Sequence, residues 1–458
     1  AEAAGDLQVS YHAGLVSARE EKALGVNVNF DPCVDILYNW RNTIVNTRAY
    51  GTDAETVIKY TNAYLDGLTA ENGENMEDGV IQCIKHFPGD GTEERDQHLV
   101  LGVNELSPEE WRASFGKVYQ NHIDRGVEMI MAGHIAVPAL QKELNSALED
   151  KDIMPATLAE ELIQDALKTE LGFNGLVITD ATHMLGMTSA MRREDYVPKS
   201  IAAGCDMFLF FNNIEEDFGF MLKGYQNGVI TEERLTDALR RILGLKAKLH
   251  LPEKQANGTL LRTREDLNVI GCEEHLQWRA EAADKGISLI KDTQNNLPIN
   301  PVDHKRIRLY MLEGEKGGIT DNGSKAQQLF VDELTKRGYE VTVNERGSRV
   351  KGATLKYRDE VDFALEVADI AGYGAQNNYR IQWSTAMANE VPWFVWEVPH
   401  AFVSLNFTTH LHDATMVKTF INAYHNNEET IKQVIDKLEG KSEFKGGHND
   451  LVWTDKWQ

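Results

Sequence analysis

The chain has 458 residues, more than one hydrophobic core usually supports, so two domains are expected. Its apolar content of 42% is typical of a globular protein, and no run of about 18 apolar residues predicts a membrane span. A net charge of -24 argues against a nucleic-acid partner, because the phosphates would be repelled.

Short apolar runs alternate with longer amphipathic segments from the start of the chain to about residue 250. Ser107 and Glu110 have the spacing of a capping box and predict the start of one helix. Apolar strands separated by helices of this length predict βαβ units and a parallel sheet buried on both faces. The runs expected to form strands cover residues 26–30, 80–87, 128–137, 175–181 and 206–211.

Polar residues follow the carboxyl ends of these strands, and in a β/α barrel those ends share one mouth where active sites are built. No GxGxxG or GxxxxGK[ST] motif follows a strand, so a nucleotide-binding sheet has little support. A TIM-type (β/α) barrel is therefore predicted. Five strand–helix units are recognised where closure needs eight, and three N-terminal units are expected to be missing.

Residues 251–275 have a Pro, Gly-containing turns and weak periodicity, and are expected to be a linker. A helical segment and further apolar runs follow, ending with VPWFVWEV (391–398), and predict a smaller α/β sandwich. The expected domains are a barrel over 1–250, this linker, and a sandwich domain over 276–458.

The four cysteines lie far apart and never form CxxC, so a disulfide framework is not expected. The chain begins with Ala and shows no leader pattern, so any leader is expected to have been removed or omitted. A cytoplasmic location is favoured over export.

The stretch KHFPGDGTEERDQH (85–98) contains two histidines. His86 and His98 match no metal-ligand spacing, so no metal is expected. Asp96 and His98 are a candidate acid/base pair, because an Asp can fix the imidazole tautomer and raise its basicity. A solvated Asp-x-His pair is the alternative. Gly89 and Gly91 suit a loop that bends or moves over a ligand.

Asp180 ends the apolar run GLVIT, so its side chain is expected in the barrel mouth. A carboxylate there can attack an anomeric carbon, and the alternative is an Asp that caps the next helix. His134 follows another strand, and it is either a ligand or a packing residue. Three further residues at strand ends could hold hydroxyl groups or form a structural ion-pair network: Asp35, Arg48 and Lys85.

In chain order these segments resemble the family 3 glycoside hydrolases, within them the β-N-acetylglucosaminidase branch. ALGVNVNFDPCVDI resembles the strand with a sugar-binding Asp, which is Asp35 here, and NTRAYGTD resembles the turn that supplies Arg48. KHFPGDG resembles the KHFPGHG signature and gives Lys85 and His86 as sugar ligands, with Asp90 in place of the His. His134 is placed with these substrate-binding residues.

RDQH resembles the Asp-x-His dyad of this branch, which implies His98 as the acid/base and Asp96 as the residue that orients it. ELGFNGLVITDATHM resembles the segment that bears the nucleophile, which implies Asp180. The resemblance implies retaining hydrolysis of terminal β-linked N-acetylglucosamine through a glycosyl-Asp intermediate, with no cofactor and no metal.

Three alternatives stay open. A neutral His repels phosphate less than a carboxylate does, so a β-N-acetylglucosaminide phosphorylase is one. Another β-glycosidase of the family, a β-glucosidase or β-xylosidase, is the second, and an inactive sugar-binding paralogue is the third. The expected partner is a small carbohydrate, and the aglycone is open between a peptidoglycan fragment (cell wall recycling), a chitin oligomer and a glycan.

Overall fold

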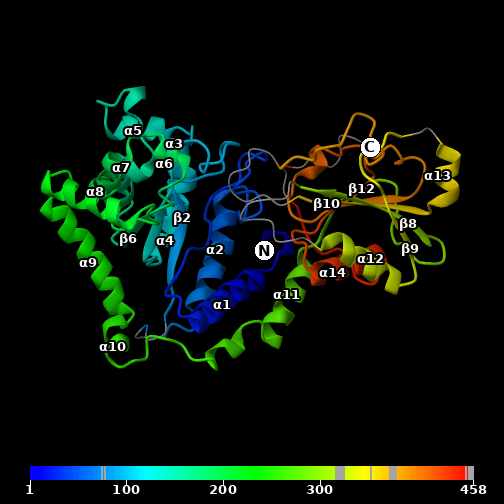
Figure 1. Ribbon diagram of the computed structural model, residues 1–458, viewed down its shortest axis with the longest axis horizontal. Helices are drawn as coiled ribbons and strands as arrows, with labels where there is room; N and C mark the ends of the chain where they lie inside the picture. Colours follow the sequence, from blue (N-terminus) through cyan, green and yellow to red (C-terminus); the bar gives the residue numbers. More distant parts are fainter. Residues whose placement is uncertain are drawn as a thin grey trace. The chain divides into compact units, whose positions relative to one another are not determined.

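The computed structural model describes residues 1–73, 76, 79–314, 325–350, 353–370, 379–448 and 451. The chain divides into two compact units (Figure 1). One unit is Leu7–His275, and the other combines Ala1–Asp6 with Leu276–Gln458. Among the described residues, no helix is both long enough and apolar enough to cross a membrane.

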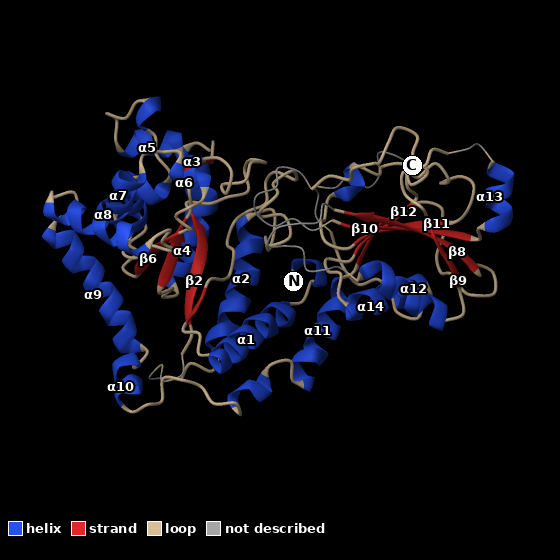
Figure 2. Cartoon of the chain, in the orientation of Figure 1, coloured by secondary structure: helices blue, strands red, loops and turns tan. Residues whose placement is uncertain are grey.

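The first unit is built on a parallel sheet with the order β1-β2-β4-β6, whose strands are drawn in red in Figure 2. Neighbouring strands pair in parallel throughout, as the alternation of strands and helices predicts. A second, two-stranded parallel ladder joins β3 and β5. The strands are β1 (Val28–Asn29), β2 (Ile81–Phe87), β3 (Gly102–Val103), β4 (Met129–Ala132), β5 (Ile135–Ala136) and β6 (Leu176–Thr179).

Four of the five predicted runs contain a strand, and the prediction is wrong for 206–211. In that run only Met207 joins the sheet, through a single bridge to Ile178. Phe210 has a φ of 58°, a left-handed conformation that ends an extended strand, and its side chain is 56% exposed. Beyond this bridge the segment still contacts the end of β6, because Leu209 N donates to Thr179 Oγ1 and Leu209 O accepts from Thr182 N, but it adds no regular ladder to the sheet.

Helices connect these strands, and several have side-chain caps. The predicted capping box of Ser107 and Glu110 is confirmed at the start of α3. Asp53, Asn213 and Thr231 cap other helices by accepting backbone N–H groups. The helices are α1 (Leu7–Leu24), α2 (Ala54–Thr69), α3 (Pro108–Trp111), η2 (Arg112–Gly116), α4 (Lys117–Asp124), α5 (Pro138–Leu144), η5 (Glu161–Glu170), α6 (Leu185–Thr188), α7 (Arg193–Ala203), α8 (Ile214–Gln226), α9 (Glu232–Lys248), α10 (Leu251–Ala256) and α11 (Glu273–Gly286).

An aromatic core supports the end of β2. Phe87, the last residue of that strand, is fully buried with its ring edge-on to Tyr119 and Trp111. The indole Nε1 of Trp111 donates to the carbonyl of Pro88 at 2.9 Å. The loop that follows β2 is therefore anchored at its start by this aromatic core.

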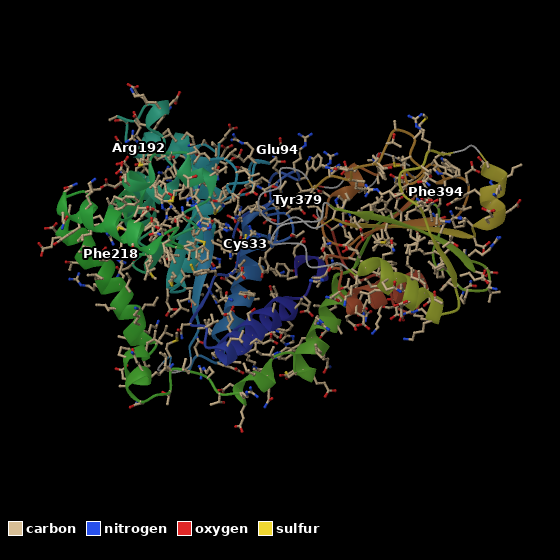
Figure 3. All side chains as sticks on the ribbon, in the orientation of Figure 1. Cys33, Glu94, Arg192, Phe218, Tyr379 and Phe394 are labelled. Carbon is tan, nitrogen blue, oxygen red and sulfur yellow. The ribbon has the colours of Figure 1, made fainter. Side chains whose placement is uncertain are left out.

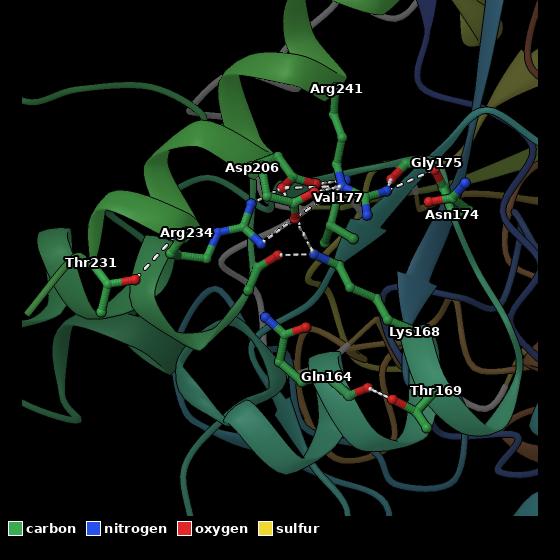
Figure 4. Close-up of polar contacts among 12 residues, drawn as sticks. Gln164, Lys168, Thr169, Asn174, Gly175, Val177, Asp206, Thr231, Arg234 and Arg241 are labelled. Atoms are coloured by element: carbon green, nitrogen blue, oxygen red, sulfur yellow. Dashed lines mark hydrogen bonds and ion pairs between the residues drawn. The ribbon is translucent and has the colours of Figure 1, made fainter.

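A buried ion network lies near the amino end of β6 (Figure 4). Asp206 accepts the backbone N–H of Val177 at 2.8 Å and pairs with Arg234. Lys168 and Arg241 lie 3.7 and 3.9 Å from the same carboxylate. This network ties η5 and α9 to the sheet.

The segment expected to be a linker (251–275) contains α10, a 3-10 helix (Asp266–Val269) and the start of α11. Gly271 N and His275 Nδ1 both contact Glu20 Oε1 on α1, at 2.9 and 2.7 Å. The segment therefore returns to the first unit and packs against it.

The second unit has a six-stranded sheet with the order β7-β12-β11-β10-β8-β9. Only β7 runs antiparallel to its neighbour, β12. The helices α12 and α14 pack on this sheet through a shared core that includes Phe330, Ile431 and Leu365. The elements are β7 (Ser288–Asp292), β8 (Arg306–Glu313), α12 (Ala326–Lys336), β9 (Glu340–Val343), α13 (Thr354–Glu360), β10 (Phe363–Asp369), β11 (His400–Ser404), β12 (Thr419–Asn422) and α14 (Glu428–Leu438).

The apolar run VPWFVWEV (391–398) forms turns, and the next strand begins only at His400. Its aromatic side chains pack as a cluster: Phe394, labelled in Figure 3, stacks on Tyr310 with ring centroids 4.9 Å apart. Trp393 packs on Tyr357 with the rings tilted by 59° and their centroids 4.8 Å apart. The apolar character of this run therefore serves side-chain packing rather than strand pairing.

Candidate active site

The predicted site residues lie at the carboxyl ends of the parallel strands. Lys85 and His86 lie in the last three residues of β2, and Asp180 directly follows β6. The charges of His86, His134 and His98 all act on Asp180, so residues from three segments surround this carboxylate. This is the shared mouth that the strand-end pattern predicts.

Asp35 and His86 form a buried pair. His86 Nδ1 lies 2.7 Å from Asp35 Oδ2, and Asp35 Oδ1 accepts the backbone N–H groups of His86 and Asp90. Burial favours a higher pKa for Asp35, but the charge of His86 and these hydrogen bonds outweigh it and hold the pKa below its usual value. Among the described residues, Nε2 of His86 has no protein partner, so this nitrogen is available to a ligand.

Cys33, Asp35 and His86 are a group whose potential metal-ligand atoms lie within 4.8 Å of one another; Cys33 is labelled in Figure 3. The thiol of Cys33 donates to Asp35 Oδ2 at 3.0 Å, and burial raises its pKa well above the usual value. Metal binding needs the thiolate, so these contacts describe a hydrogen-bonded group rather than a prepared ligand set. The absence of a metal stays a prediction.

Asp96 and His98 form the predicted dyad geometry. Asp96 Oδ1 accepts both the backbone N–H and the Nδ1–H of His98, at 2.8 and 2.7 Å. The carboxylate of Asp96 is fully buried, whereas the imidazole is 39% exposed. With Nδ1 bound to Asp96, Nε2 is the nitrogen that can exchange a proton with a ligand.

The pKa of His98 is raised. Burial alone would lower it, but the hydrogen bond and charge of Asp96, together with the charge of Asp180, favour the imidazolium. For Asp180, burial favours a higher pKa, but the nearby His86 and His98 and the hydrogen bond from the Ala181 N–H hold it below the usual value. The site therefore favours a protonated His98 beside an ionised Asp180.

Asp180 does not cap the helix that follows it. In the described part of the chain its Oδ1 accepts the N–H of the next residue alone, Ala181, at 2.7 Å, and α6 begins later, at Leu185. Its own backbone N–H is held by the carbonyl of Ala132 on β4. The main chain of Asp180 is thus fixed to the sheet while the side chain stays partly exposed.

Arg48 and Lys85 bring positive charge to this mouth. The Nε of Arg48 donates to the Ile44 carbonyl at 2.8 Å, and no other hydrogen bond to its guanidinium is seen in the part of the chain that is described. Burial opposes the charge of Arg48, but the nearby Cys33 and Asp35 raise its pKa. Lys85 Nζ lies 3.9 Å from Asp31. Both side chains keep donors for a ligand.

His134 is fully buried, and both of its ring nitrogens are occupied. Nε2 donates to the Ala181 carbonyl at 2.9 Å, and Nδ1 accepts the hydroxyl of Thr157 at 3.0 Å. Burial lowers its pKa, which agrees with a neutral ring. These contacts favour the packing interpretation of His134, with the ring holding the backbone that follows Asp180.

Gly89 and Gly91 have φ values of 123° and 109°, which favour glycine. A Cβ on Gly91 would lie 2.0 Å from the Ile36 carbonyl oxygen, and one on Gly89 would lie 2.2 Å from the Phe115 ring. These glycines therefore allow the loop to pack closely, and the predicted loop movement stays a prediction.

Asn42 and Gln97 are site residues that the sequence analysis did not identify. Asn42 Nδ2 donates to Asp90 Oδ1 at 2.9 Å, and Gln97 Nε2 lies 3.4 Å from Asp90 Oδ2. The position of Gln97, between Asp96 and His98, is the one sequence signal that could have singled it out.

Known proteins match this chain along most of its length. The glycosyl hydrolase family 3 N terminal domain matches residues 2–245. A β-N-acetylglucosaminidase/β-glucosidase of Cellulomonas fimi is 40% identical over 450 residues, which cover 97% of this chain and 78% of that protein. A β-hexosaminidase A of Pseudoalteromonas piscicida is 27% identical over 300 residues, which cover 63% of this chain and 48% of that protein.

Solved structures also resemble this chain over nearly its whole length. A β-glucoside phosphorylase, BglX, shares 38% identity with a TM-score of 0.91 and covers 99% of this chain and 79% of its own. A family 3 β-N-acetylglucosaminidase of Paenibacillus sp. str. FPU-7 shares 21% identity, a likeness of fold alone, with a TM-score of 0.74 over 97% of this chain and 80% of its own. The predicted TIM-type barrel followed by a separate α/β domain is confirmed. The chain belongs to glycosyl hydrolase family 3.

Proposed function

We propose that this chain is a retaining exo-β-N-acetylglucosaminidase, which releases terminal β-linked N-acetylglucosamine. One observation carries the proposal. His98 is held by Asp96 at 2.7 Å with Nε2 directed to exchange protons, and its charge interacts with that of Asp180 at the end of β6. A nucleophilic carboxylate and a separate proton donor are the two groups that retaining hydrolysis needs.

In the first step, a carboxylate oxygen of Asp180 attacks C1 of the sugar. The bond from C1 to the leaving oxygen breaks as His98 Nε2–H protonates that oxygen, and a glycosyl ester forms on Asp180. The raised pKa of His98 supports a protonated donor, and the lowered pKa of Asp180 supports an ionised nucleophile.

In the second step, the now neutral Nε2 of His98 takes a proton from water, whose oxygen attacks C1. The ester bond breaks, the sugar leaves with its β configuration retained, and Asp180 is again a carboxylate. Asp96 stabilises the imidazolium that forms in this step, because its buried carboxylate accepts the Nδ1–H.

The sugar hydroxyls are proposed to contact Arg48, Lys85 and His86, whose side chains keep donors within the site. Asp35 is fully buried behind His86, so its proposed part is to orient that ring through Nδ1. His134 is proposed to act indirectly, by donating a hydrogen bond to the backbone carbonyl of Ala181, which follows Asp180.

A phosphorylase is the second candidate. The relative with 38% identity is described as a β-glucoside phosphorylase, and the proton donor here is a His, which is neutral after the first step. Phosphate could then attack C1 in place of water and give a sugar 1-phosphate. The cationic Arg48 and Lys85 would favour the approach of that anion.

The choice between N-acetylglucosamine and glucose as the sugar is a separate question, because the Cellulomonas fimi relative is named for both β-N-acetylglucosaminidase and β-glucosidase activity. The Asp-x-His dyad is the feature that favours the N-acetylglucosaminide here. An inactive sugar-binding protein needs neither Asp180 nor the dyad, and both are present.

The test compares 4-nitrophenyl β-N-acetylglucosaminide with the β-glucoside, each in phosphate-free buffer and in phosphate. The proposal expects faster cleavage of the N-acetylglucosaminide and free N-acetylglucosamine as the product in both buffers. N-acetylglucosamine 1-phosphate as the main product in phosphate would replace the hydrolase with the phosphorylase. Equal cleavage of the glucoside would contradict the sugar assignment, and no turnover by the wild-type chain, with Asp180→Ala as the blank, would support the inactive binder.

A further inference from the structure

Asp90 is a buried carboxyl group whose hydrogen-bond partners, among the residues that the structure describes, are all donors. Its side chain accepts from Gly91 N at 2.6 Å, from Asn42 Nδ2 at 2.9 Å and from Gln97 Nε2 at 3.4 Å. Its backbone N–H donates to Asp35 at 2.8 Å. Asp90 is only 6% exposed, so protein encloses it almost completely.

Gln97 connects Asp90 to the dyad. Its Oε1 accepts the backbone N–H of His134 at 2.8 Å, and this contact turns the NH2 group toward Asp90. Its backbone carbonyl accepts from Gly186 at 3.0 Å, and the carbonyl of His98 accepts from Leu185 at the same distance. Gln97 is 1% exposed and lies between the two dyad residues. Its anchoring therefore fixes the backbone from which both side chains extend.

Asn42 extends the same network to the segment that carries Arg48. Its Nδ2 donates to Asp90 and also to the Glu93 carbonyl at 2.8 Å. Its Oδ1 accepts the backbone N–H groups of Ile44 and Val45, and the Ile44 carbonyl in turn accepts from Arg48 Nε. The carboxyl group of Asp90 thus connects the segment that carries Arg48 to the loop that carries His98.

We propose that Asp90 is a positioning residue that holds His98 in place for proton transfer by anchoring Gln97. This inference rests on the proposed function of His98 as the acid/base. Asp90 itself touches no reacting atom. Its side chain holds Gln97 in place, and Gln97 in turn determines the position of the Asp96–His98 pair at the strand ends.

The charge of Asp90 agrees with this role. Burial and the neighbouring Asp35 raise its pKa to about 7, while the hydrogen bonds of Gly91 and Asn42 and the charge of Arg48 lower it. All three of its contacts are N–H donors, so the ionised form is the one that they fit.

The test uses Asp90→Asn and Gln97→Met, which keep side-chain volume but remove the carboxylate or the amide, and the double variant. Each is assayed with two aryl β-N-acetylglucosaminides, one with a good leaving group and one with a poor leaving group. If His98 is misplaced, kcat/KM for the poor leaving group falls by about 10- to 100-fold, because that reaction depends on proton donation. The good leaving group loses less than about 3-fold by the same argument.

The double variant is expected to lose less than the product of the two single losses, because both changes break the same Asp90–Gln97 contact, while Gln97→Met also removes the acceptor of the His134 N–H. Equal losses for the two substrates, or losses that multiply in the double variant, would overturn the proposal. Thermal unfolding of each variant identifies any general loss of fold. Asp53→Ala, which removes the cap of α2, is the control for a stability change without loss of the network.

A second measurement does not depend on turnover. The pKa of His98 is followed by NMR of labelled histidine in the wild type and in both single variants. The proposal expects it to fall toward the ordinary histidine value in each variant, because the hydrogen bond to Asp96 is less well held. An unchanged value in both variants overturns the proposal. If the wild type cleaves no β-glycoside while this shift is seen, the proposed function fails and the positioning role stands.

Discussion

The Nδ1–H of His98 is directed at a fully buried carboxylate oxygen of Asp96, 2.7 Å away, which leaves Nε2 for a ligand. This single contact fixes the tautomer and orientation of the imidazole, and it raises the affinity of the ring for a proton. The charge state of His98 therefore depends on Asp96.

Asp96→Asn is expected to lower kcat by about 100-fold, because general acid/base catalysis contributes that order of rate and the amide no longer holds the productive tautomer. The pH profile gives a sharper readout. Asp96 raises the pKa of His98, so its loss lowers that pKa, and the alkaline limb of kcat/KM moves to lower pH. An alkaline limb in the same place would show that His98 is not the titrating acid.

Gly91→Ala is expected to destabilise the first unit by about 1–3 kcal/mol and to reduce activity strongly, since strain at such a backbone adds to a clash. The new Cβ would lie 2.0 Å from the Ile36 carbonyl, on a backbone with a φ of 109°. Gly126→Ala is the matched control, because Gly126 also has a positive φ but nothing lies within 4 Å of its Cβ. Urea unfolding and turnover are measured for both, and equal effects would contradict the close packing of the loop.

Asp206→Ala is expected to lower the free energy of unfolding by about 3–5 kcal/mol, because among the described residues it leaves the buried Arg234 and Lys168 with only the partly exposed Asp237 as a counter-charge. Arg234 and Lys168 are both at most 9% exposed beside this carboxylate. Glu149→Ala is the control, because its ion pair with Lys151 is largely exposed and is expected to change stability by less than about 1 kcal/mol. A small effect at Asp206 would show that the network adds little to stability.

The second unit is expected to lose stability as the pH falls from about 6.5 toward about 4, because it buries two neutral histidines. Burial lowers the pKa of His400 and of His410 to about 4. Since the folded pKa lies below the unfolded one, the unfolded chain binds the protons first. Full stability is present above the unfolded pKa of about 6.5 and is lost toward the folded value.

Each histidine contributes a slope of up to about 1.4 kcal/mol per pH unit within that window. Structure gives the reason at His400, whose Nε2 accepts the backbone N–H of Lys418 at 2.8 Å and cannot do so once protonated. Urea unfolding at several pH values measures the slope, and His410→Gln is expected to reduce it by one proton. A slope that stays the same in this variant would contradict the assignment.

Much of the site could be predicted from the sequence, because local patterns determine where strands end. Lys85, His86 and Asp180 follow apolar runs, and those runs are strands of one parallel sheet. Asp96 and His98 are two residues apart, so their contact needs little tertiary information.

The contacts of Asn42 and Gln97 could not be predicted, because they depend on how distant segments approach. Asn42 and Asp90 are 48 residues apart, and no local spacing relates them. The run 206–211 has the composition of a strand, yet the left-handed conformation of Phe210 ends it after one bridge. Apolar composition alone does not separate strand pairing from the side-chain packing seen at 391–398.

The central claim is that Asp180 forms a covalent bond to the sugar, and one measurement tests it most directly. The wild-type chain is incubated with a fluorinated N-acetylglucosaminyl fluoride, which forms a glycosyl-enzyme faster than water can release it, and is then digested and analysed by mass spectrometry. We predict one added sugar on the peptide that contains Asp180, and none in Asp180→Ala. A labelled peptide that excludes Asp180, or turnover of the reagent by Asp180→Ala at the wild-type rate, would contradict the claim.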